Sequence, residues 1–299
     1  MTTIFDDLKN AFNRRDNGLV KLILINVIIF VVFKLLYVIL FLSGVPHIYE
    51  LIATQMRMPA NAMSFLFRPW TIFTTMFFHE DFFHIIFNML FFYWFGQIIE
   101  EYLGSRRLIA LYILGGLAGG ILYITAYNLL PVFQAKVAAT MLQGASAAVY
   151  AVVVAAATLV PNYTFHLLFL GAVRIVYIAT FYVFLSVVGV TGANAGGNLA
   201  HLGGALLGFL FIRQLQKGND LGKPVSYVTE TVGAWFKPKS HIKVSYTNKN
   251  RKVDTSRNSV AKPGQAEIDA ILDKISHSGY DSLSKEEKQK LFSASQKDE

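Results

Sequence analysis

Three sets of polar residues lie inside apolar stretches of the chain, where their side chains could do chemistry. Ser146 begins the apolar run SAAVYAVVVAAATLV, and Tyr150 follows it by about one helical turn. His201 lies in NLAHLGGALLGF, and His84 and Asn88 are four residues apart in HIIFN. Residues four apart on a helix share one face. Because polar groups are costly in hydrocarbon, those found there are candidate functional residues.

Together these residue types supply the parts of acyl-transfer catalysis. A serine at a helix N-terminus meets free backbone N–H groups and the positive end of the helix dipole, which favour a developing oxyanion. His201 can act as the general base, and His84 and Asn88 can donate hydrogen bonds to the oxyanion. No Asp or Glu lies at that level to orient His201, so we expect a Ser–His dyad in which Tyr150 packs on the imidazole.

Each of these residues also has a purely structural interpretation. A serine among small residues in a membrane helix usually makes packing contacts, and Ser146 fits that role. His201 can pack on a neighbouring helix, because Gly204 and Gly208 follow it and let another backbone approach closely. The polar pair in HIIFN can tie helices together. The argument for a catalytic role is that, with six spans and the N-terminus inside, all three sets lie near the helix ends that face the outside of the membrane.

A fourth set is the pattern G-x-x-x-E-x-x-x-G formed by Gly96, Glu100 and Gly104. Its carboxylate could be catalytic. At 1.5 Å per residue, however, Glu100 lies about 24 Å from His84 along one helix. We therefore expect Glu100 to accept hydrogen bonds at a loop.

The composition indicates what kind of scaffold positions these residues. Of 299 residues, 54% are hydrophobic and only 15% are charged, against about 25% charged in average globular chains. The apolar residues form runs long enough to span a bilayer, which predicts an all-α polytopic membrane protein. The net charge of +8 lies largely in the tail and in loops, so it does not indicate nucleic-acid binding. The chain has no cysteine, and the chemistry above needs no metal and no cofactor.

We predict six membrane-spanning helices. Their approximate ranges are 19–43, 81–103, 107–129, 145–160, 173–190 and 198–214. The last three are short or contain polar residues, so they need shielding by protein rather than lipid. Residues 44–78 are too apolar for a solvated loop and too broken by prolines to span. They predict a structured interfacial loop, in which Arg68 and Trp70 suit the headgroup level.

The loop charges predict that both termini are cytoplasmic. With the N-terminus inside, ten basic residues of the short segments lie inside and three lie outside. The inner ten are Lys9, Arg14, Arg15, Lys21, Arg106, Arg107, Arg174, Arg213, Lys217 and Lys223, and the outer three are Arg57, Arg68 and Lys136. The N-terminal segment is not rich in Arg and Ser as a transit peptide would be. We therefore expect a bacterial plasma membrane rather than an organelle.

The predicted domain organisation has four parts. They are a cytoplasmic segment (1–18), a six-span domain (19–216), a basic polar linker (217–263) and a C-terminal helical hairpin (264–299). In the hairpin, Ile268, Ile271, Leu272 and Ile275 keep helical spacing, Gly279 ends the first helix, and Ser282 or Ser284 caps the second. The hairpin is too short for an independent core. Docking to a cytoplasmic partner is one interpretation of its role.

The motifs resemble those of a rhomboid intramembrane serine protease over about residues 60–215. The resemblance is carried by HEDFFHIIFN (79–88), G-x-x-x-E-x-x-x-G (96–104), GASA (144–147) and A-H-x-x-G-x-x-x-G (200–208). The order and spacing of these motifs are hard to obtain by chance. The pair Arg68 and Trp70, here separated by a proline, is also similar to a feature of that family.

The resemblance implies a role for each site residue. Ser146 would be the nucleophile and His201 the general base. His84, Asn88 and the backbone N–H of Ser146 would form the oxyanion hole.

Three further positions are implied by the same resemblance. Tyr150 would stack on the catalytic histidine, and Gly144 would allow the tight turn before the serine helix. Ala147 departs from the family, which usually has glycine there. Its methyl group could narrow the pocket or shift helix packing, so we expect an altered rate or substrate preference rather than loss of activity.

The implied activity is cleavage of single-pass membrane proteins within or near the bilayer. It would occur in a water-filled cavity open to the outer face, with the fifth span and its adjoining loop, about 173–197, as a lateral gate. The substrate would offer an extended segment with helix-breaking residues and a small residue before the cut.

Two alternatives come from other functional classes. A rhomboid-fold protein can bind membrane clients without cutting them, although such proteins generally lack the Ser–His pair. A small-solute transporter could use His84, Asn88 and His201 as a polar pathway, but the sequence shows no internal repeat of the kind common in transporters.

Overall fold

The computed structural model describes residues 17–167, 171–235 and 264–295, and these belong to two compact units. The first unit covers residues 1–237 and the second covers 238–299. The predicted N-terminal segment, 1–18, lies almost wholly outside the described residues. Each unit has its own packing, so each is considered by itself.

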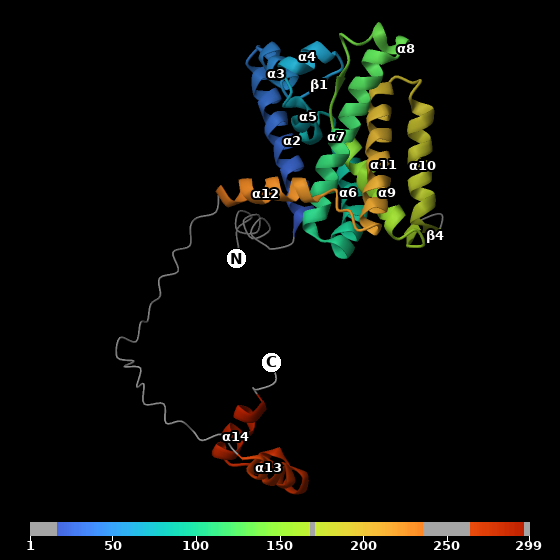
Figure 1. Cartoon of the computed structure of the whole chain (residues 1–299). Coiled ribbons are helices and arrows are strands. Elements are labelled where there is room, and N and C mark those ends of the chain that lie inside the picture. The colour runs from blue at the N-terminus through green and yellow to red at the C-terminus, as the bar shows by residue number, and fades with distance from the viewer. Residues whose placement is uncertain (1–16, 168–170, 236–263, 296–299) are drawn as a thin grey trace. The chain divides into compact units, whose positions relative to one another are not determined.

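The first unit is a bundle of helices (Figure 1). Within the described residues, four helices are long and apolar enough to cross a membrane: α2 (Gly18–Leu42), α6 (Phe82–Leu103), α7 (Ser105–Leu129) and α11 (Ala195–Gln216). Two shorter apolar helices accompany them, α9 (Ser146–Leu159) and α10 (Ile175–Gly189). Each of the six predicted segments thus overlaps with one helix. That α9 and α10 also cross the bilayer stays a prediction.

Local hydrogen bonds explain where several of these helices begin. The side chain of Asp81 accepts a hydrogen bond from the backbone N–H of His84 (2.7 Å), which caps α6. Asn194 accepts one from the backbone N–H of Gly197 in the same way and caps α11. Gly104 has a φ of +82°, a left-handed conformation that lets α6 end and α7 start one residue later.

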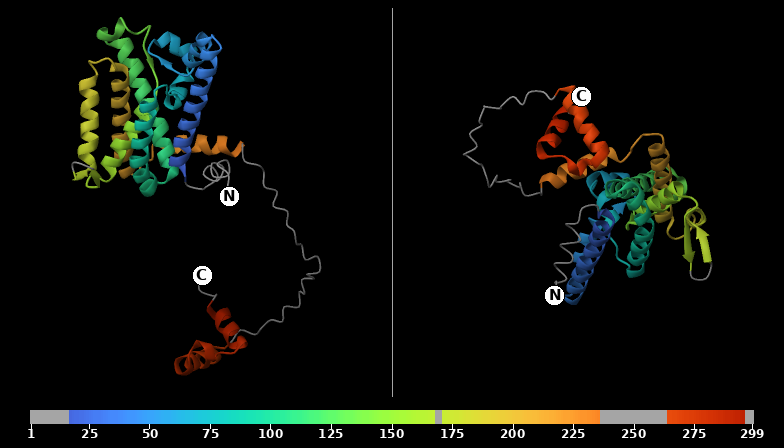
Figure 2. Two further views of the ribbon diagram at one scale, coloured as in Figure 1. Left: turned by 180° about the vertical axis from the view of Figure 1, so that it is seen from behind. Right: turned by 90° about the horizontal axis from the view of Figure 1, so that it is seen from below.

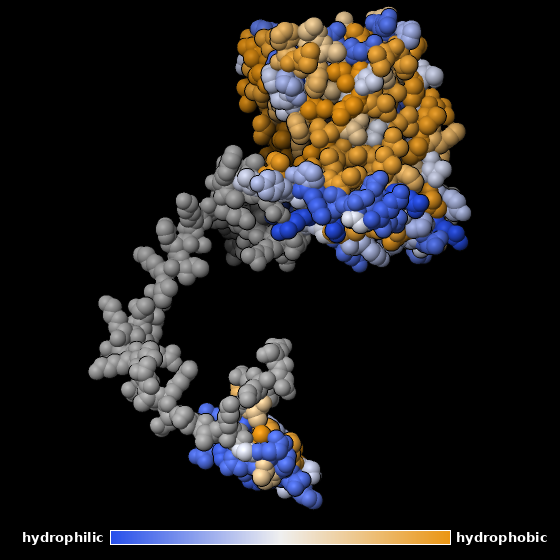
Figure 3. Space-filling model, in the orientation of Figure 1, coloured by the Kyte–Doolittle hydropathy of each residue, from blue (hydrophilic) through white to orange (hydrophobic). Residues whose placement is uncertain are grey.

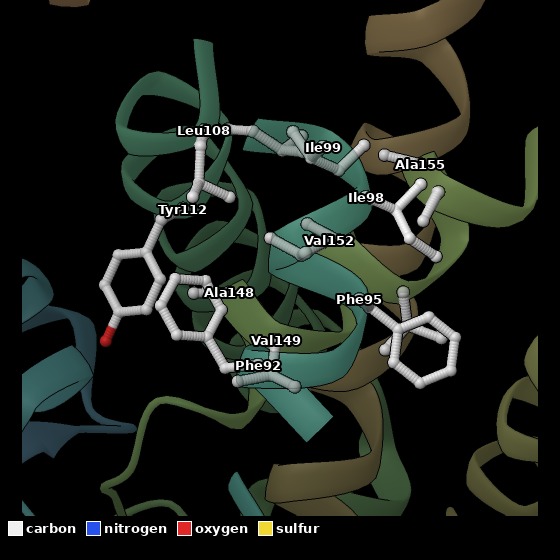
Figure 4. Packing of buried hydrophobic residues seen from close by; sticks show 14 of the residues in the cluster. Phe92, Phe95, Ile98, Ile99, Leu108, Tyr112, Ala148, Val149, Val152 and Ala155 are labelled. Carbon is white, nitrogen blue, oxygen red and sulfur yellow. The ribbon is translucent and has the colours of Figure 1, made fainter. Parts of the chain in front are cut away.

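Helix α9 lies in the middle of the bundle, where α7 and α11 pack closely on it. The close approach depends on glycines, because a Cβ atom added at Gly204 or Gly208 of α11 would overlap the backbone carbonyl of Ala147 or Ala151 in α9. On another face, apolar side chains of α6 and α7 pack on α9 (Figure 4). These side chains include Phe92, Ile99, Leu108 and Tyr112. They form one buried cluster with Val149 and Val152 of α9.

The shortness of α9 sets the depth of its first residue. Its 14 residues span about 21 Å, whereas the 25 residues of α7 span about 38 Å. The chain leaves α7, forms the short helix α8 (Pro131–Gln134) and continues through the strand β2 (Met141–Leu142). This strand pairs antiparallel with β1 (Met58–Pro59), so Ser146 begins its helix within the bundle rather than at its end.

The segment 44–78 is structured, as predicted. It contains α3 (Pro46–Thr54), β1, α4 (Ala62–Phe67), α5 (Thr71–Thr74) and the 3-10 helix η1 (Thr75–Phe77). Arg68 donates to the carbonyl oxygen of Thr54 (2.9 Å), and the indole of Trp70 donates to that of Gln55 (3.1 Å). Both side chains therefore satisfy carbonyl groups at the C-terminal end of α3.

The surface of the first unit carries a broad apolar region (Figure 3). The exposed side chains of α2 that contribute to it include Val31, Leu35, Ile39 and Leu42. Polar residues cover the end of the unit where α12 (Lys223–Trp235) lies (Figure 3). This distribution is the one expected for helices surrounded by lipid.

Two elements of the first unit were not predicted. Helix α12 (Lys223–Trp235) packs on α7 and lies within the segment 217–263 that was expected to be a linker. Its apolar residues Val225, Val228, Val232 and Trp235 recur at helical spacing, a pattern hidden by the polar residues between them. The other element is a hairpin of β3 (Thr164–Leu167) and β4 (Gly171–Arg174) before α10, visible from below in Figure 2. The rest of the expected linker, 236–263, lies outside the described residues.

The second unit contains α13 (Gln265–Ser278), the 3-10 helix η2 (Tyr280–Ser282) and α14 (Lys285–Ser295). Ser284 caps α14 through a reciprocal pair: its hydroxyl accepts from the backbone N–H of Glu287 (3.3 Å), and the Glu287 carboxylate accepts from the N–H of Ser284 (2.7 Å). Lys274 of α13 donates to the same carboxylate (2.9 Å). The hydrogen bond from Lys274, followed by that from Ser284, lowers the pKa of Glu287 to about 2.

Candidate active site

A cavity of about 880 Å³ in the first unit brings together the polar residues singled out in the sequence. Its lining includes His84 and Asn88 from α6, Ser146 and Tyr150 from α9, and His201 from α11. These residues are up to 117 positions apart in the chain (201 − 84). The helix packing, rather than local sequence, therefore assembles the site.

Ser146 and His201 are hydrogen-bonded. The serine Oγ lies 2.8 Å from Nε2 of the histidine. Gly204 lies three residues after His201, and its Cα packs against the backbone of Ala147. This close approach of α11 to α9 brings the two side chains within hydrogen-bond distance. A histidine at this distance can take the hydroxyl proton as the serine attacks an electrophile.

Tyr150 stacks on the imidazole of His201, with ring centroids 4.2 Å apart and planes 9° from parallel. This is the packing expected from the sequence. It holds one face of the imidazole, because Tyr150 is buried and its ring cannot move without disturbing α9.

The other ring nitrogen of His201 contacts a residue that the sequence analysis did not identify. Nδ1 lies 3.1 Å from the hydroxyl of Ser186, which belongs to α10 and is only 1% exposed. A single serine in the apolar run of α10 gives no sequence signal, since small polar residues are common at helix contacts in membranes. Only the fold places it at the site.

The turn before Ser146 is held by two further contacts. Gly144 has a φ of +109°, and a Cβ atom there would overlap the imidazole of His84. The buried side chain of His79 accepts a hydrogen bond from the backbone N–H of Ala145 (3.1 Å). Sequence reasoning missed His79 as a site residue, although it begins the motif HEDFFHIIFN.

The expected oxyanion donors lie on α6 and at the start of α9. The amide of Asn88 donates one hydrogen to the carbonyl oxygen of His84 (2.8 Å), which fixes its orientation on α6 and leaves its second hydrogen for a ligand. The backbone N–H of Ser146 lies in the first turn of α9, where no carbonyl group of the helix accepts from it. Asn88 and the imidazole of His84 line the cavity.

Ala147 does not line the cavity. It is buried, and its methyl group packs against Gly119 of α7, where a Cβ atom would overlap it. Of the two expected consequences of this alanine, the structure therefore favours an effect on helix packing over a narrower pocket.

Gly96 and Glu100 contact the start of α2, and Gly104 follows at the end of their helix, α6. The carboxylate of Glu100 accepts hydrogen bonds from the backbone N–H of Leu19 (3.1 Å) and the hydroxyl of Ser105. A Cβ atom at Gly96 would overlap Leu19. The motif therefore anchors the start of α2, in agreement with the structural interpretation of Glu100.

A charged cluster lies at the rim of the cavity. Arg57 binds the carboxylates of Glu50 and Glu80 and donates to the side chain of Gln143 (2.9 Å). Burial alone would lower the pKa of Arg57, but its hydrogen bonds to these carboxylates raise it. Burial, followed by the charge of Glu80, raises the pKa of Tyr49. The cluster ties the structured loop to the residues just before Ser146.

Within the described residues, no group of three or more His, Asp or Glu side chains is placed to hold a metal ion.

Comparison with protein families matches residues 66–217 to the Rhomboid domain. A second match covers residues 251–297 and is to a family of unknown function, DUF6576. A curated relative from Arabidopsis thaliana, RHOMBOID-like protein 12, mitochondrial, is 29% identical over 157 residues, which are 50% of this chain and 47% of the relative. The chain thus spans about half the length of that relative.

Proposed function

Because the chain belongs to the rhomboid family and is an integral, multi-pass membrane protein, we propose that it is an intramembrane serine endopeptidase. The proposed reaction is hydrolysis of peptide bonds in or near transmembrane segments of single-pass membrane proteins. One observation carries the proposal: Ser146 Oγ is hydrogen-bonded to His201 Nε2 at the wall of a cavity inside the helix bundle.

In the first half of the reaction, Ser146 Oγ attacks the scissile carbonyl carbon while His201 Nε2 takes the hydroxyl proton. The oxyanion accepts hydrogen bonds from the Ser146 N–H, Asn88 and His84. Loss of one such donor typically lowers the rate by about 10²–10³. The intermediate collapses when the protonated histidine gives its proton to the leaving amine, which leaves an acyl group on the serine.

In the second half, water attacks the acyl-enzyme as His201 Nε2 takes one of its protons. Collapse of the second tetrahedral intermediate returns that proton to Ser146 Oγ and releases the new carboxyl terminus. No step needs a group beyond these side chains and water.

The substrate segment must be extended at the cut, because a helix occupies its carbonyl groups in hydrogen bonds. Helix-breaking residues near the cleavage site and a small residue before it meet this requirement. Access from the lipid would run past α10 and the loop that follows it, about 173–197.

The proposed membrane is a bacterial plasma membrane with both termini in the cytoplasm. The excess of Lys and Arg residues in the segments assigned to the inside supports this orientation of the termini. Since the chain has no cysteine, single cysteines at Lys136 and Lys217 can be labelled with a membrane-impermeant maleimide in sealed cells. The orientation requires Lys136→Cys to react and Lys217→Cys to stay unlabelled.

The test of the function is cleavage of a panel of single-pass substrates in liposomes by wild type, Ser146→Ala and His201→Ala. We expect cleavage by wild type only, with thermal unfolding showing that the variants are folded. Equal cleavage by all three would assign the activity to a contaminant. Intact substrates with folded wild type would favour the alternative, a rhomboid-fold protein that binds membrane clients without cutting them.

A further inference from the structure

We propose that Ser186 is a positioning residue of this site, whose hydroxyl holds His201 in the tautomer that carries its proton on Nδ1. This proposal rests on the proposed hydrolytic function, because it explains how the histidine is prepared to act as a base. It also identifies α10 as the helix that prepares it.

Four hydrogen bonds run through the site in series. Ser146 Oγ contacts His201 Nε2 (2.8 Å), and Nδ1 of the same ring contacts Ser186 Oγ (3.1 Å). Ser186 donates to the hydroxyl of Tyr150 (3.0 Å), which donates to the backbone carbonyl oxygen of Tyr182 (3.3 Å). The series therefore starts at the serine nucleophile and ends at the backbone of α10.

The last member of the series sets the direction of all the others. A carbonyl oxygen can only accept, so Tyr150 must donate to Tyr182 and its oxygen is left to accept from Ser186. Ser186 has only one hydrogen, so its oxygen is left to accept from Nδ1–H of His201. The second ring nitrogen then carries no hydrogen and can accept from Ser146. The geometry assigns this tautomer without any charged group beside Nδ1.

The assignment matters because the other tautomer cannot act as the base. If Nε2 carried the hydrogen, it would donate to Ser146 Oγ and could not take the serine proton. After proton transfer both ring nitrogens carry hydrogen, and Ser186 still accepts from Nδ1. Its hydroxyl therefore stabilises the histidine before and after the transfer, in the position that a carboxylate occupies in a Ser–His–Asp triad.

Both acceptors that direct the series belong to α10. Ser186 and Tyr182 are one helical turn apart, whereas the serine and histidine of the dyad lie on α9 and α11. Tyr182 also stacks on Phe91 of α6, with ring centroids 4.5 Å apart. A shift of α10 away from α11 would remove both acceptors together. The position of α10 therefore determines whether the dyad is competent.

The first test is kinetic and uses the full chain in liposomes. Ser186→Ala leaves a buried Nδ1–H without an acceptor, so we expect kcat to fall by about 10- to 100-fold with KM little changed. Ser186→Thr keeps the hydroxyl and should recover most of the rate. Tyr150→Phe keeps the stacked ring but removes the hydroxyl that directs Ser186, so it should give an intermediate loss. Thr180→Ala, which removes an exposed hydroxyl from the same helix, should match wild type.

The second test does not depend on activity. Nitrogen-15 NMR of histidine-labelled protein in detergent distinguishes a protonated ring nitrogen from a bare one, and loss of a signal in His201→Asn identifies His201. Wild type should show a bare Nε2 and a protonated Nδ1, and Ser186→Ala should show a mixture of tautomers.

These results separate the two proposals. If wild type cuts no substrate but the tautomer still changes in Ser186→Ala, the positioning role stands and the protease function fails. If Ser186→Ala keeps both the wild-type kcat and the single tautomer, the positioning role is overturned even though the protein cuts. If Ser186→Thr does not fold, the tautomer of His201 in Ser186→Ala decides whether the positioning role of Ser186 stands.

Discussion

At the scale of single residues, the orientation of His201 depends on a series of hydrogen-bonded side chains. Ser146, His201, Ser186 and Tyr150 each make a hydrogen bond to the next, although none of the four is charged at neutral pH in the tautomer assigned above. A neutral network avoids the cost of burying a charge among apolar helices. This explains how His201 can be oriented without a carboxylate beside its Nδ1.

Ala147 provides a prediction at this scale. Its methyl group packs on Gly119 outside the cavity, so Ala147→Gly should reduce stability rather than change substrate preference. Glycine in a helix costs about 1 kcal/mol relative to alanine, and loss of the methyl contact adds to this. Thermal unfolding in detergent should show a lower Tm, with cleavage of the preferred substrate unchanged below it.

The matched control is Ala157→Gly in the same helix, which reports the cost of replacing a buried helical alanine by glycine at a position remote from Ser146. A new substrate preference in Ala147→Gly would mean that the methyl group shapes the pocket after all.

At the scale of elements, the distance between α9 and α11 determines whether the dyad forms. Gly204 and Gly208 lie one turn apart on α11, and the Cα atom of each packs against a backbone carbonyl group of α9. Backbone atoms cannot rotate aside as a flexible side chain can. An added methyl group must therefore push the two helices apart.

Gly204→Ala should therefore lower kcat more than Gly208→Ala does. Both changes overpack the same helix contact, so each should cost about 1–3 kcal/mol of stability. Gly204 is beside the dyad, however, and a misplacement of about 1 Å can lower a rate by about 10²-fold. Steady-state kinetics below the Tm of both variants checks the difference, and equal losses of kcat would show that helix separation does not control the dyad.

Helices α13 and α14 of the second unit provide a pH prediction. The pKa of Glu287 is lowered from 4.5 to about 2 in the folded state, so the group stabilises the pair of helices fully above pH 4.5. This stabilisation is lost as the pH falls from about 4.5 to about 2, because the unfolded state binds the proton first. Amide hydrogen exchange of α13 and α14 should therefore lose protection over that range.

Glu287→Gln serves as the control, since it cannot titrate and should remove this part of the pH dependence. If its protection falls over the same range as that of wild type, another group is responsible.

At the scale of the whole molecule, the two units match two different families, one over residues 66–217 and the other over 251–297. The described residues that line the cavity lie between Glu50 and His201, all in the first unit. The second unit has its own pair of helices, α13 and α14. That it docks on a cytoplasmic partner stays a prediction.

A chain ending at Lys237 should accordingly keep the kcat of the full chain on a model substrate in liposomes. The boundary follows α12, which packs on α7 and belongs to the first unit. Comparison of the two proteins at equal folded concentration is the measurement. A large loss of kcat in the shorter protein, with its Tm unchanged, would give the second unit a role in catalysis.

Sequence reasoning alone was enough to predict the apolar helices and to propose Ser146 and His201 as a dyad. Apolar runs of sufficient length specify helices locally, since backbone groups in lipid must bond within their own segment. Ser146, His201, His84 and Asn88 could be found because polar residues are conspicuous in such runs. Asp81, which precedes α6, and Gly104, which separates α6 from α7, show that local residues also set the helix boundaries.

Which polar atoms contact one another depends on how the helices pack. Ser186 contacts His201, and His79 holds the turn before Ser146, because the rotation and separation of several helices place them there. Those quantities are set by glycine contacts spread over α7 and α11, and no single segment encodes them. The depth of Ser146 likewise follows from the pairing of β1 with β2, two strands that are 82 residues apart (141 − 59). Hydrogen bonds between helices form only in the packed bundle. The helical periodicity of a sequence shows which residues share one face of a helix, but it does not show which atoms of another helix they contact.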